Sequence, residues 1–193
     1  MQTFSKVYDS YAQAERVVRD LETAGVPSAD ISLVANRHVS EKYANVDEAS
    51  SAASGAGIGA VVGGGTGLLT GLGMLAIPGL GPVVAAGWLA ATAVGAIAGS
   101  AVGGIIGALV DAGTPVADAH VYSEAVRRGG TLVTVRTDHV TDQVSAILNR
   151  HQPIDPTVRR LEYEQTGWKE FDPKAPAYRP DQTEIERMRR RYE

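Results

Sequence analysis

Residues 49–110 contain no charged side chain, although charged residues make up 21% of the whole chain. Glu48 and Asp111 bound this uncharged segment. Soluble monomers seldom expose apolar surface on this scale, so the segment must be covered by something. The sequence therefore predicts that it is buried in lipid, between copies of the chain, or under the rest of the same chain.

Glycines recur at every fourth position of the uncharged segment, in two series. The first series is Gly55, Gly59, Gly63, Gly67 and Gly71, and the second is Gly87, Ala91, Gly95, Gly99, Gly103 and Gly107. Residues four apart lie on one face of an α-helix, so each series predicts a helix with a glycine groove. Such grooves let helices approach closely in lipid, whereas in water each glycine weakens an isolated helix by roughly 0.5–1 kcal/mol. The pattern predicts helix packing and oligomerisation through these residues.

A turn rich in proline and glycine divides the segment into two arms, at about residues 51–76 and 83–110. The turn residues are Pro78, Gly79, Gly81 and Pro82. Each arm exceeds the roughly 20 residues that a helix needs to cross a bilayer core. Trp88 follows the turn, as an aromatic anchor at a membrane interface or as packing at the hairpin end. The prediction is a long glycine-zipper helical hairpin over residues 49–111.

The two flanks of the segment have the patterns of one α+β domain. Residues 3–8 alternate as a strand, Ser10 and Gln13 form a capping box before a helix, and residues 31–35 read as a strand. After the segment, a short helix at 122–126 precedes a strand at 131–135, and a second helix follows Asp138. An edge strand around Ile154 completes the pattern.

Two β-α-β halves, residues 1–48 and 112–155, predict a ferredoxin-like split β-α-β domain that the hairpin interrupts. A small parallel α/β sheet is the alternative. Residues 156–193 form a polar C-terminal tail, in which residues 167–173 predict an extended docking segment. A terminal helix is expected from Asp181, and its arginines would meet anionic lipid or remain in solvent.

The layout resembles the bacterial general stress protein 17M, or YflT-like heat-induced stress protein, family. The helix-to-strand junction that carries the resemblance consists of Tyr122, Ala125, Val126, Arg127, Gly129 and Gly130. The resemblance covers roughly residues 1–155 and implies a stress-associated, non-enzymatic protein. It supplies no catalytic residues.

The sequence patterns that could indicate catalysis or ligand binding are incomplete. The glycines of residues 55–59 fit a dinucleotide fingerprint, but no strand precedes them and no acid occurs before Asp111. The four histidines lack helical ligand spacing, and the chain has no cysteine. The net charge of −4 argues against nucleic-acid binding. We therefore expect no catalytic residue, cofactor or metal, and the sequence identifies no particular small molecule as a ligand.

Three functions remain open from the sequence. The first is a non-enzymatic stress protein whose hairpin joins it to membrane lipid and to other copies of itself. The second is a soluble self-assembling scaffold with hairpins buried between subunits. The third is a small-molecule-binding α/β domain with a hairpin anchor. No signal peptide pattern opens the sequence, so we expect a cytoplasmic location, at the inner face of the membrane if the hairpin contacts lipid.

Overall fold

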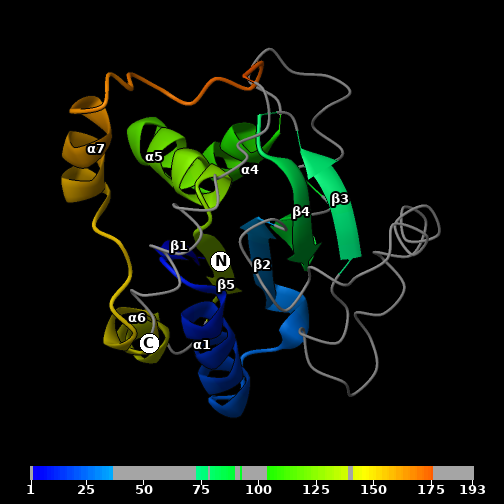
Figure 1. Cartoon of the computed structure of the whole chain (residues 1–193). Helices are drawn as coiled ribbons and strands as arrows, with labels where there is room; N and C mark the ends of the chain where they lie inside the picture. Colours follow the sequence, from blue (N-terminus) through cyan, green and yellow to red (C-terminus); the bar gives the residue numbers. More distant parts are fainter. Residues whose placement is uncertain are drawn as a thin grey trace.

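The computed structural model describes residues 2–36, 73–77, 79–89, 92, 104–138 and 141–175. Its centre is a five-stranded sheet with helices on both faces (Figure 1). The strands are β1 (Gln2–Tyr8), β2 (Ile31–Asn36), β3 (Gly73–Ile77), β4 (Gly81–Ala86) and β5 (Thr131–Thr137). They lie in the order β1-β5-β2-β4-β3, and every neighbouring pair is antiparallel. The α+β class predicted from the sequence is confirmed.

The first and second strands are parallel to each other, because β5 lies between them and is antiparallel to both. Helix α1 (Tyr11–Thr23) and the short 3₁₀ helix η1 (Ser28–Asp30) connect β1 to β2. The two halves predicted from the flanks therefore interlock in one sheet: the strand of the second half inserts between the two strands of the first.

Helices α1 and α6 (Thr141–Arg150) cover one face of the sheet. Ser10 caps α1 through the predicted capping box with Gln13, which satisfies backbone N–H groups at the helix start. The apolar stripe of α1 packs with Val144, Ile147 and Leu148 of α6 against β5. This layer forms one half of the core.

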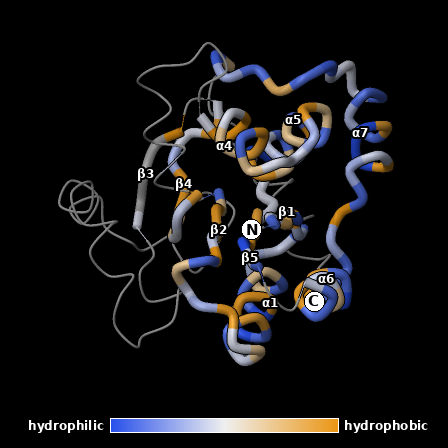
Figure 2. Tube along the Cα trace, turned by 180° about the vertical axis from the view of Figure 1, so that it is seen from behind, coloured by the Kyte–Doolittle hydropathy of each residue, from blue (hydrophilic) through white to orange (hydrophobic). Residues whose placement is uncertain are grey.

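Helices α4 (Ile105–Asp111) and α5 (Val116–Arg127) cover the opposite face, and α7 (Pro156–Glu164) lies beside α5. Val7, Val34 and Leu132 point from the sheet into this second layer. In Figure 2 the hydrophobic colour follows β2 and β4, which lie between the two helical layers. The domain thus has three layers, with apolar residues on both faces of its sheet.

The predicted helical hairpin is wrong for residues 73–86. Strands β3 and β4 form a β-hairpin with Gly73 opposite Ala85 and Ile77 opposite Gly81. β4 continues the sheet by pairing with β2. A proline- and glycine-rich turn between two short apolar runs fits a β-hairpin as well as a helical one, and the unpaired edge of β2 selects the β form.

The second glycine series does not lie on one helix. Gly87 follows β4 with φ +88°, and a Cβ there would overlap the carbonyl oxygen of Ile31 and lie 2.7 Å from Ser32 Cα. Its missing side chain lets β4 and β2 meet inside one chain, which corrects its assignment to a helix groove. Helix α4, which contains Gly107, begins only after Gly104, whose φ is +82°.

The other residues of the two series lie outside the described residues, and so does Pro78. They are Gly55, Gly59, Gly63, Gly67, Gly71, Ala91, Gly95, Gly99 and Gly103. In the part of the chain that the structure describes, no helix combines the length and the apolarity needed to cross a bilayer.

The end of the domain differs from the prediction in two ways. Residues 152–155 do not form a strand, although the Ile154 N–H donates to the Val7 carbonyl oxygen at 2.8 Å, on the outer edge of β1. Helix α7 then begins at the start of the polar tail, where no helix was predicted. Asp155 caps it by accepting from the Thr157 and Val158 N–H groups, with Pro156 at its first position.

Candidate functional site

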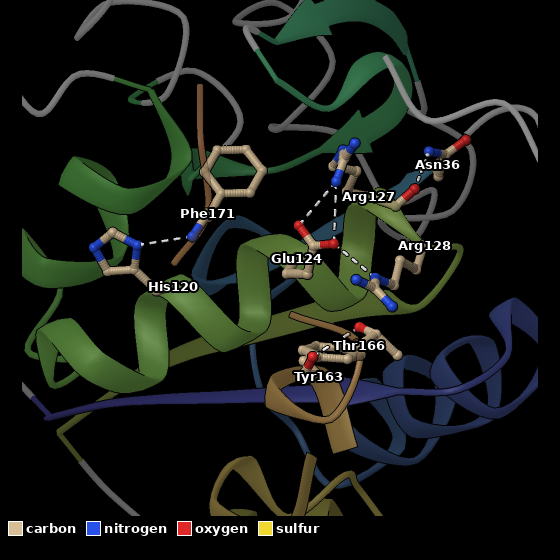
Figure 3. Close-up of polar contacts among 8 residues, drawn as sticks. All are labelled: Asn36, His120, Glu124, Arg127, Arg128, Tyr163, Thr166 and Phe171. Carbon is tan, nitrogen blue, oxygen red and sulfur yellow. Dashed lines mark hydrogen bonds and ion pairs between the residues drawn. The ribbon is translucent and has the colours of Figure 1, made fainter. Parts of the chain in front are cut away.

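A buried carboxylate lies near the C-terminal end of α5. Glu124 is 1% exposed, and its carboxylate accepts from Arg127 at 3.1 and 3.2 Å and from Arg128 Nε at 2.6 Å (Figure 3). Spacings of three and four residues put both arginines on the glutamate's side of the helix. A carboxylate this deeply buried is stable only with such partners, so the three side chains act as a unit.

This unit is joined to the sheet and to α7. The Asn36 amide, at the end of β2, donates to the Arg127 carbonyl oxygen at 2.9 Å. Arg128 lies over the ring of Tyr163 from α7, with 4.3 Å between the guanidinium carbon and the ring centroid. The cation–π contact brings the two helices together. We call Glu124, Arg127, Arg128 and Tyr163 the α5–α7 cluster.

Arg159 extends the α5–α7 cluster to the end of β1. Its guanidinium donates to both carboxylate oxygens of Asp9, at 2.8 and 3.0 Å. Burial disfavours the charged guanidinium, but Asp9 and Tyr163 outweigh it and raise the pKa of Arg159. Burial also raises the pKa of Tyr163, against the opposing effect of Arg159. The contacts therefore fix α7 in a position set by β1 and α5.

The chain leaves α5 through a close approach to β1. A Cβ on Gly130 would lie 3.0 Å from the Ala125 carbonyl oxygen and 3.2 Å from that of Tyr8. Gly129 precedes it with φ +110°. The two glycines singled out at the helix-to-strand junction thus serve a tight reversal that feeds β5 into the sheet.

The segment after α7 docks on the domain of its own chain. We call residues 165–175 the strap; in Figure 1 it crosses above α5 toward the β3–β4 hairpin. Phe171 is 3% exposed, and its N–H donates to Nδ1 of His120 at 3.2 Å. Gly79 makes room: a Cβ there would lie 2.7 Å from the Phe171 ring and 2.8 Å from the Asp172 carbonyl oxygen. The docking segment expected at residues 167–173 therefore contacts the hairpin turn and α5.

Trp88 packs within the chain. The guanidinium carbon of Arg136 lies 4.5 Å from its ring centroid, and Arg136 also donates to Asp30 at 3.2 Å. The indole rests against the apolar cluster under α4 and α5. Of the two roles considered for Trp88, the structure shows the packing one.

The contacts described above join helices and strands of the domain to one another. No three histidine or acidic side chains are grouped as metal ligands within the described ranges. The spacing of Glu124 to Arg127 and Arg128 is visible in the sequence. The sequence does not reveal that Glu124 is buried. It also does not reveal that Tyr163 and Arg159 contact other elements, because these contacts depend on where α7 packs.

Two buried tyrosines make stability sensitive to alkali. Burial, with a smaller contribution from Tyr122, raises the pKa of Tyr8 well above 10. Burial, followed by Asp118 and Asp155, raises the pKa of Tyr122 to about 12. The unfolded chain loses these protons near pH 10, before the folded chain does. Stability is therefore complete below pH 10 and falls above it, up to about pH 12 for Tyr122.

Tyr8→Phe should weaken this alkaline sensitivity. The variant loses the hydrogen bond from the Tyr8 hydroxyl to the Leu148 carbonyl oxygen, so we expect it to be about 1 kcal/mol less stable at pH 7. Between pH 10 and 11 its free energy of unfolding should fall by about 1 kcal/mol less than that of the parent. Urea unfolding at pH 7, 10 and 11 measures both effects, and equal losses in the two proteins would contradict the assignment.

Comparison with known proteins finds one family whose model matches part of the chain. Residues 3–77 match the family model described as the heat induced stress protein YflT domain. No curated protein and no solved structure matches the chain. The matched range contains β1, α1, β2 and β3 and ends before α5. The family expected from the resemblance is therefore supported, but over a shorter range than residues 1–155.

Proposed function

The chain carries a heat induced stress protein YflT domain at residues 3–77, and from this premise we propose that it is a non-enzymatic stress-response protein that assembles with copies of itself. The stress-related role comes from the family. The first glycine series, from Gly55 to Gly71, is the proposed contact between subunits, and the α+β domain is the platform that carries it.

One observation supports protein–protein contact over other uses of these glycines. In the described part of the uncharged segment, Gly87 meets the backbone of β2, and Gly79 meets the backbone of Asp172 and Pro173. In both cases a Cβ would come within 3 Å of backbone atoms. These two glycines thus serve close contact with polypeptide, and assembly through the first series would use glycine in the same way.

The fold also supplies fixed attachment points for the proposed contact segment. Residues 37–72 connect the end of β2 to the start of β3, and both strands belong to the same sheet, on either side of β4. The segment therefore leaves and re-enters one rigid body. Copies joined through it would hold their domains around a common centre.

Attachment to a membrane is the second candidate for the same segment. Residues 49–72 are uncharged. Because both ends of this segment join one sheet, it would enter the membrane from one side and return to that side rather than cross the bilayer once. In this case the domain would lie in the cytoplasm at the inner face of the membrane, with lipid as the partner. The two candidates predict different results in a flotation experiment.

We further infer a ferredoxin-like core, extended by the β3–β4 hairpin. The position of β5 supports this fold: β5 lies between the parallel strands β1 and β2, and α1 connects β1 to β2. Ile154 bonds to the outer edge of β1, the position at which a fourth strand of that fold would lie.

Gly63→Leu should disrupt assembly, because leucine would fill the groove of the first series. Gly65→Leu is the matched control: it introduces the same side chain two positions away, which is the opposite side of a helix. Analytical ultracentrifugation without detergent should show a larger particle for the parent and for Gly65→Leu, and at least a tenfold weaker association for Gly63→Leu.

Two other outcomes decide against this proposal. If the parent protein sediments as a monomer at all concentrations, self-assembly is excluded. Flotation of the parent with liposomes of neutral and anionic phospholipid, kept in Gly63→Leu because leucine is more apolar than glycine, would instead assign the segment to the membrane.

A further inference from the structure

The part of the strap that docks is a short unit with a conformation of its own. Phe171 is buried, whereas Asp172 and Lys174 are exposed. The Asp172 carboxylate accepts from the Lys174 N–H at 2.8 Å, and the Asp172 carbonyl oxygen accepts from the Ala175 N–H at 3.1 Å. These bonds close a turn, so the conformation is set within the segment itself. We call residues 171–175 the docking unit.

The surface that receives the docking unit is formed by the β3–β4 hairpin turn and α5. Phe171 shares an apolar cluster with Ile77 and Leu80 of the turn, and its N–H donates to His120 of α5 (Figure 3). A Cβ at Gly79 would lie 2.8 Å from backbone atoms of the unit. We call Ile77, Gly79, Leu80 and His120 the seat. None of these contacts requires that the docking unit and the seat belong to the same chain.

The link between α7 and the docking unit contains an exposed pivot. The Trp168 N–H donates to the Tyr163 carbonyl oxygen at 3.2 Å, and the two rings meet edge-on with 5.5 Å between centroids. The chain is therefore held on α7 as far as Trp168. Lys169 and Glu170 follow; both are exposed, and no hydrogen bond joins either of them to another described residue. Rotation at this pivot can place Phe171 anywhere within about 10 Å of Trp168.

The outer face of α7 offers a second copy a place beside this pivot. Val158 and Leu161 are 54% and 56% exposed, and their spacing of three residues puts them on one face of the helix. An identical helix can cover such a pair about a two-fold axis, because each copy then presents the same face to the other. Since the pivot follows α7 directly, a copy that covers this pair lies close to the pivot.

We propose that the docking unit is exchanged between copies, so that Phe171 of one chain fills the seat of a second copy and receives a docking unit in return. The exchange forms a contact between subunits besides the first glycine series. It keeps every contact of the seat and changes only which chain supplies the docking unit, so it costs little once two copies are held together.

The exchange rests on the proposed self-assembly in one respect. In a single copy the short link gives the docking unit a high effective concentration at its own seat, and this favours docking within the chain. Assembly brings the seat of a second copy equally near. The docking unit then has two equivalent seats within reach, and the reciprocal arrangement closes a symmetric pair.

A spin label on the docking unit tests the exchange in full-length proteins. The chain has no cysteine, so Lys174→Cys provides a single labelling position on an exposed side chain. The labelled protein also carries Gly79→Ala, whose methyl group blocks its own seat. Its label should therefore be mobile in electron paramagnetic resonance. Adding the unlabelled Phe171→Ala variant, which has an open seat and no ring to fill it, should immobilise the label.

The ratio of mobile to immobile label should fall about tenfold or more at saturation, because burial of the Phe171 ring and one hydrogen bond are restored. The matched control is the double variant Phe171→Ala/Gly79→Ala, in which the added seat is blocked as well, so the label should stay mobile. Circular dichroism checks that each variant is folded. His120→Lys offers the Phe171 N–H no acceptor, and in place of Gly79→Ala it weakens the seat of the labelled protein from the side of α5.

Two results would overturn the exchange. The first is a label that stays mobile at every concentration of Phe171→Ala; if the parent assembles in ultracentrifugation, the proposed function stands without the exchange. The second is equal immobilisation by the control with the blocked seat, since the label would then respond to association in general. Immobilisation by Phe171→Ala alone, together with normal assembly of Gly63→Leu, would support the exchange and decide against the first glycine series.

Discussion

Gly87→Ala should destabilise the protein by about 3 kcal/mol or more, the larger of the two strongest effects that we expect. The residue has φ +88°, a conformation that costs a residue with a Cβ about 1–2 kcal/mol. The added methyl group would also overlap the Ile31 carbonyl oxygen and approach Ser32 Cα to 2.7 Å. Backbone cannot move aside as a side-chain end can, so β4 would have to separate from β2.

Gly25→Ala separates the two contributions. Gly25 has φ +89° and no atom within 4 Å of the position of a Cβ, so only the conformational cost applies. We expect a loss of about 1–2 kcal/mol there. Urea unfolding followed by circular dichroism gives both values. Equal losses in the two variants would mean that the approach of β4 to β2 contributes nothing to the cost at Gly87.

Glu124→Ala should cost about 3 kcal/mol. The substitution removes a 1% exposed carboxylate and leaves two arginines without their main partner. Their side chains are 20% and 32% exposed, so solvent compensates for part of the loss and the cost stays at the lower end for a broken buried pair. Free energies of unfolding from urea titration measure the effect.

Glu15→Ala is the matched control, because Glu15 also pairs with an arginine four residues away on a helix. There Arg19 is 62% exposed, and we expect a change within about 0.5 kcal/mol. Arg128→Met completes a double-mutant cycle, and removing Glu124 should cost less in its background. A loss below about 1 kcal/mol for Glu124→Ala would show that the α5–α7 cluster does not hold the domain together.

Local patterns predicted the elements of the flanks well. Ser10 and Gln13 mark the start of α1, and the alternation at residues 3–8 marks β1, because caps and alternating side chains depend only on near neighbours. Helix α7 was missed although its signal was present, with Asp155 at the cap and Pro156 after it.

The contacts of the candidate site were harder to predict. Residues 167–173 were recognised as a docking segment from their aromatic and proline content. That Phe171 meets His120 and Gly79 depends on three distant parts of the chain reaching one place. Similarly, Tyr163 meets Arg128 and Arg159 meets Asp9 because of where α7 packs, which no spacing within α5 reveals.

The sequence by itself determined the α+β class, because composition and short-range periodicity carry that information, and its resemblance to a stress protein family agrees with the family model that matches residues 3–77. Only the tertiary structure decided that residues 73–77 and 81–86 form strands. Their apolar side chains and glycines suit a helix or a strand, and the open edge of β2 offers backbone hydrogen bonds that only a strand can use. Gly87 shows the consequence: a residue predicted to line a helix groove instead lets two strands of one sheet meet.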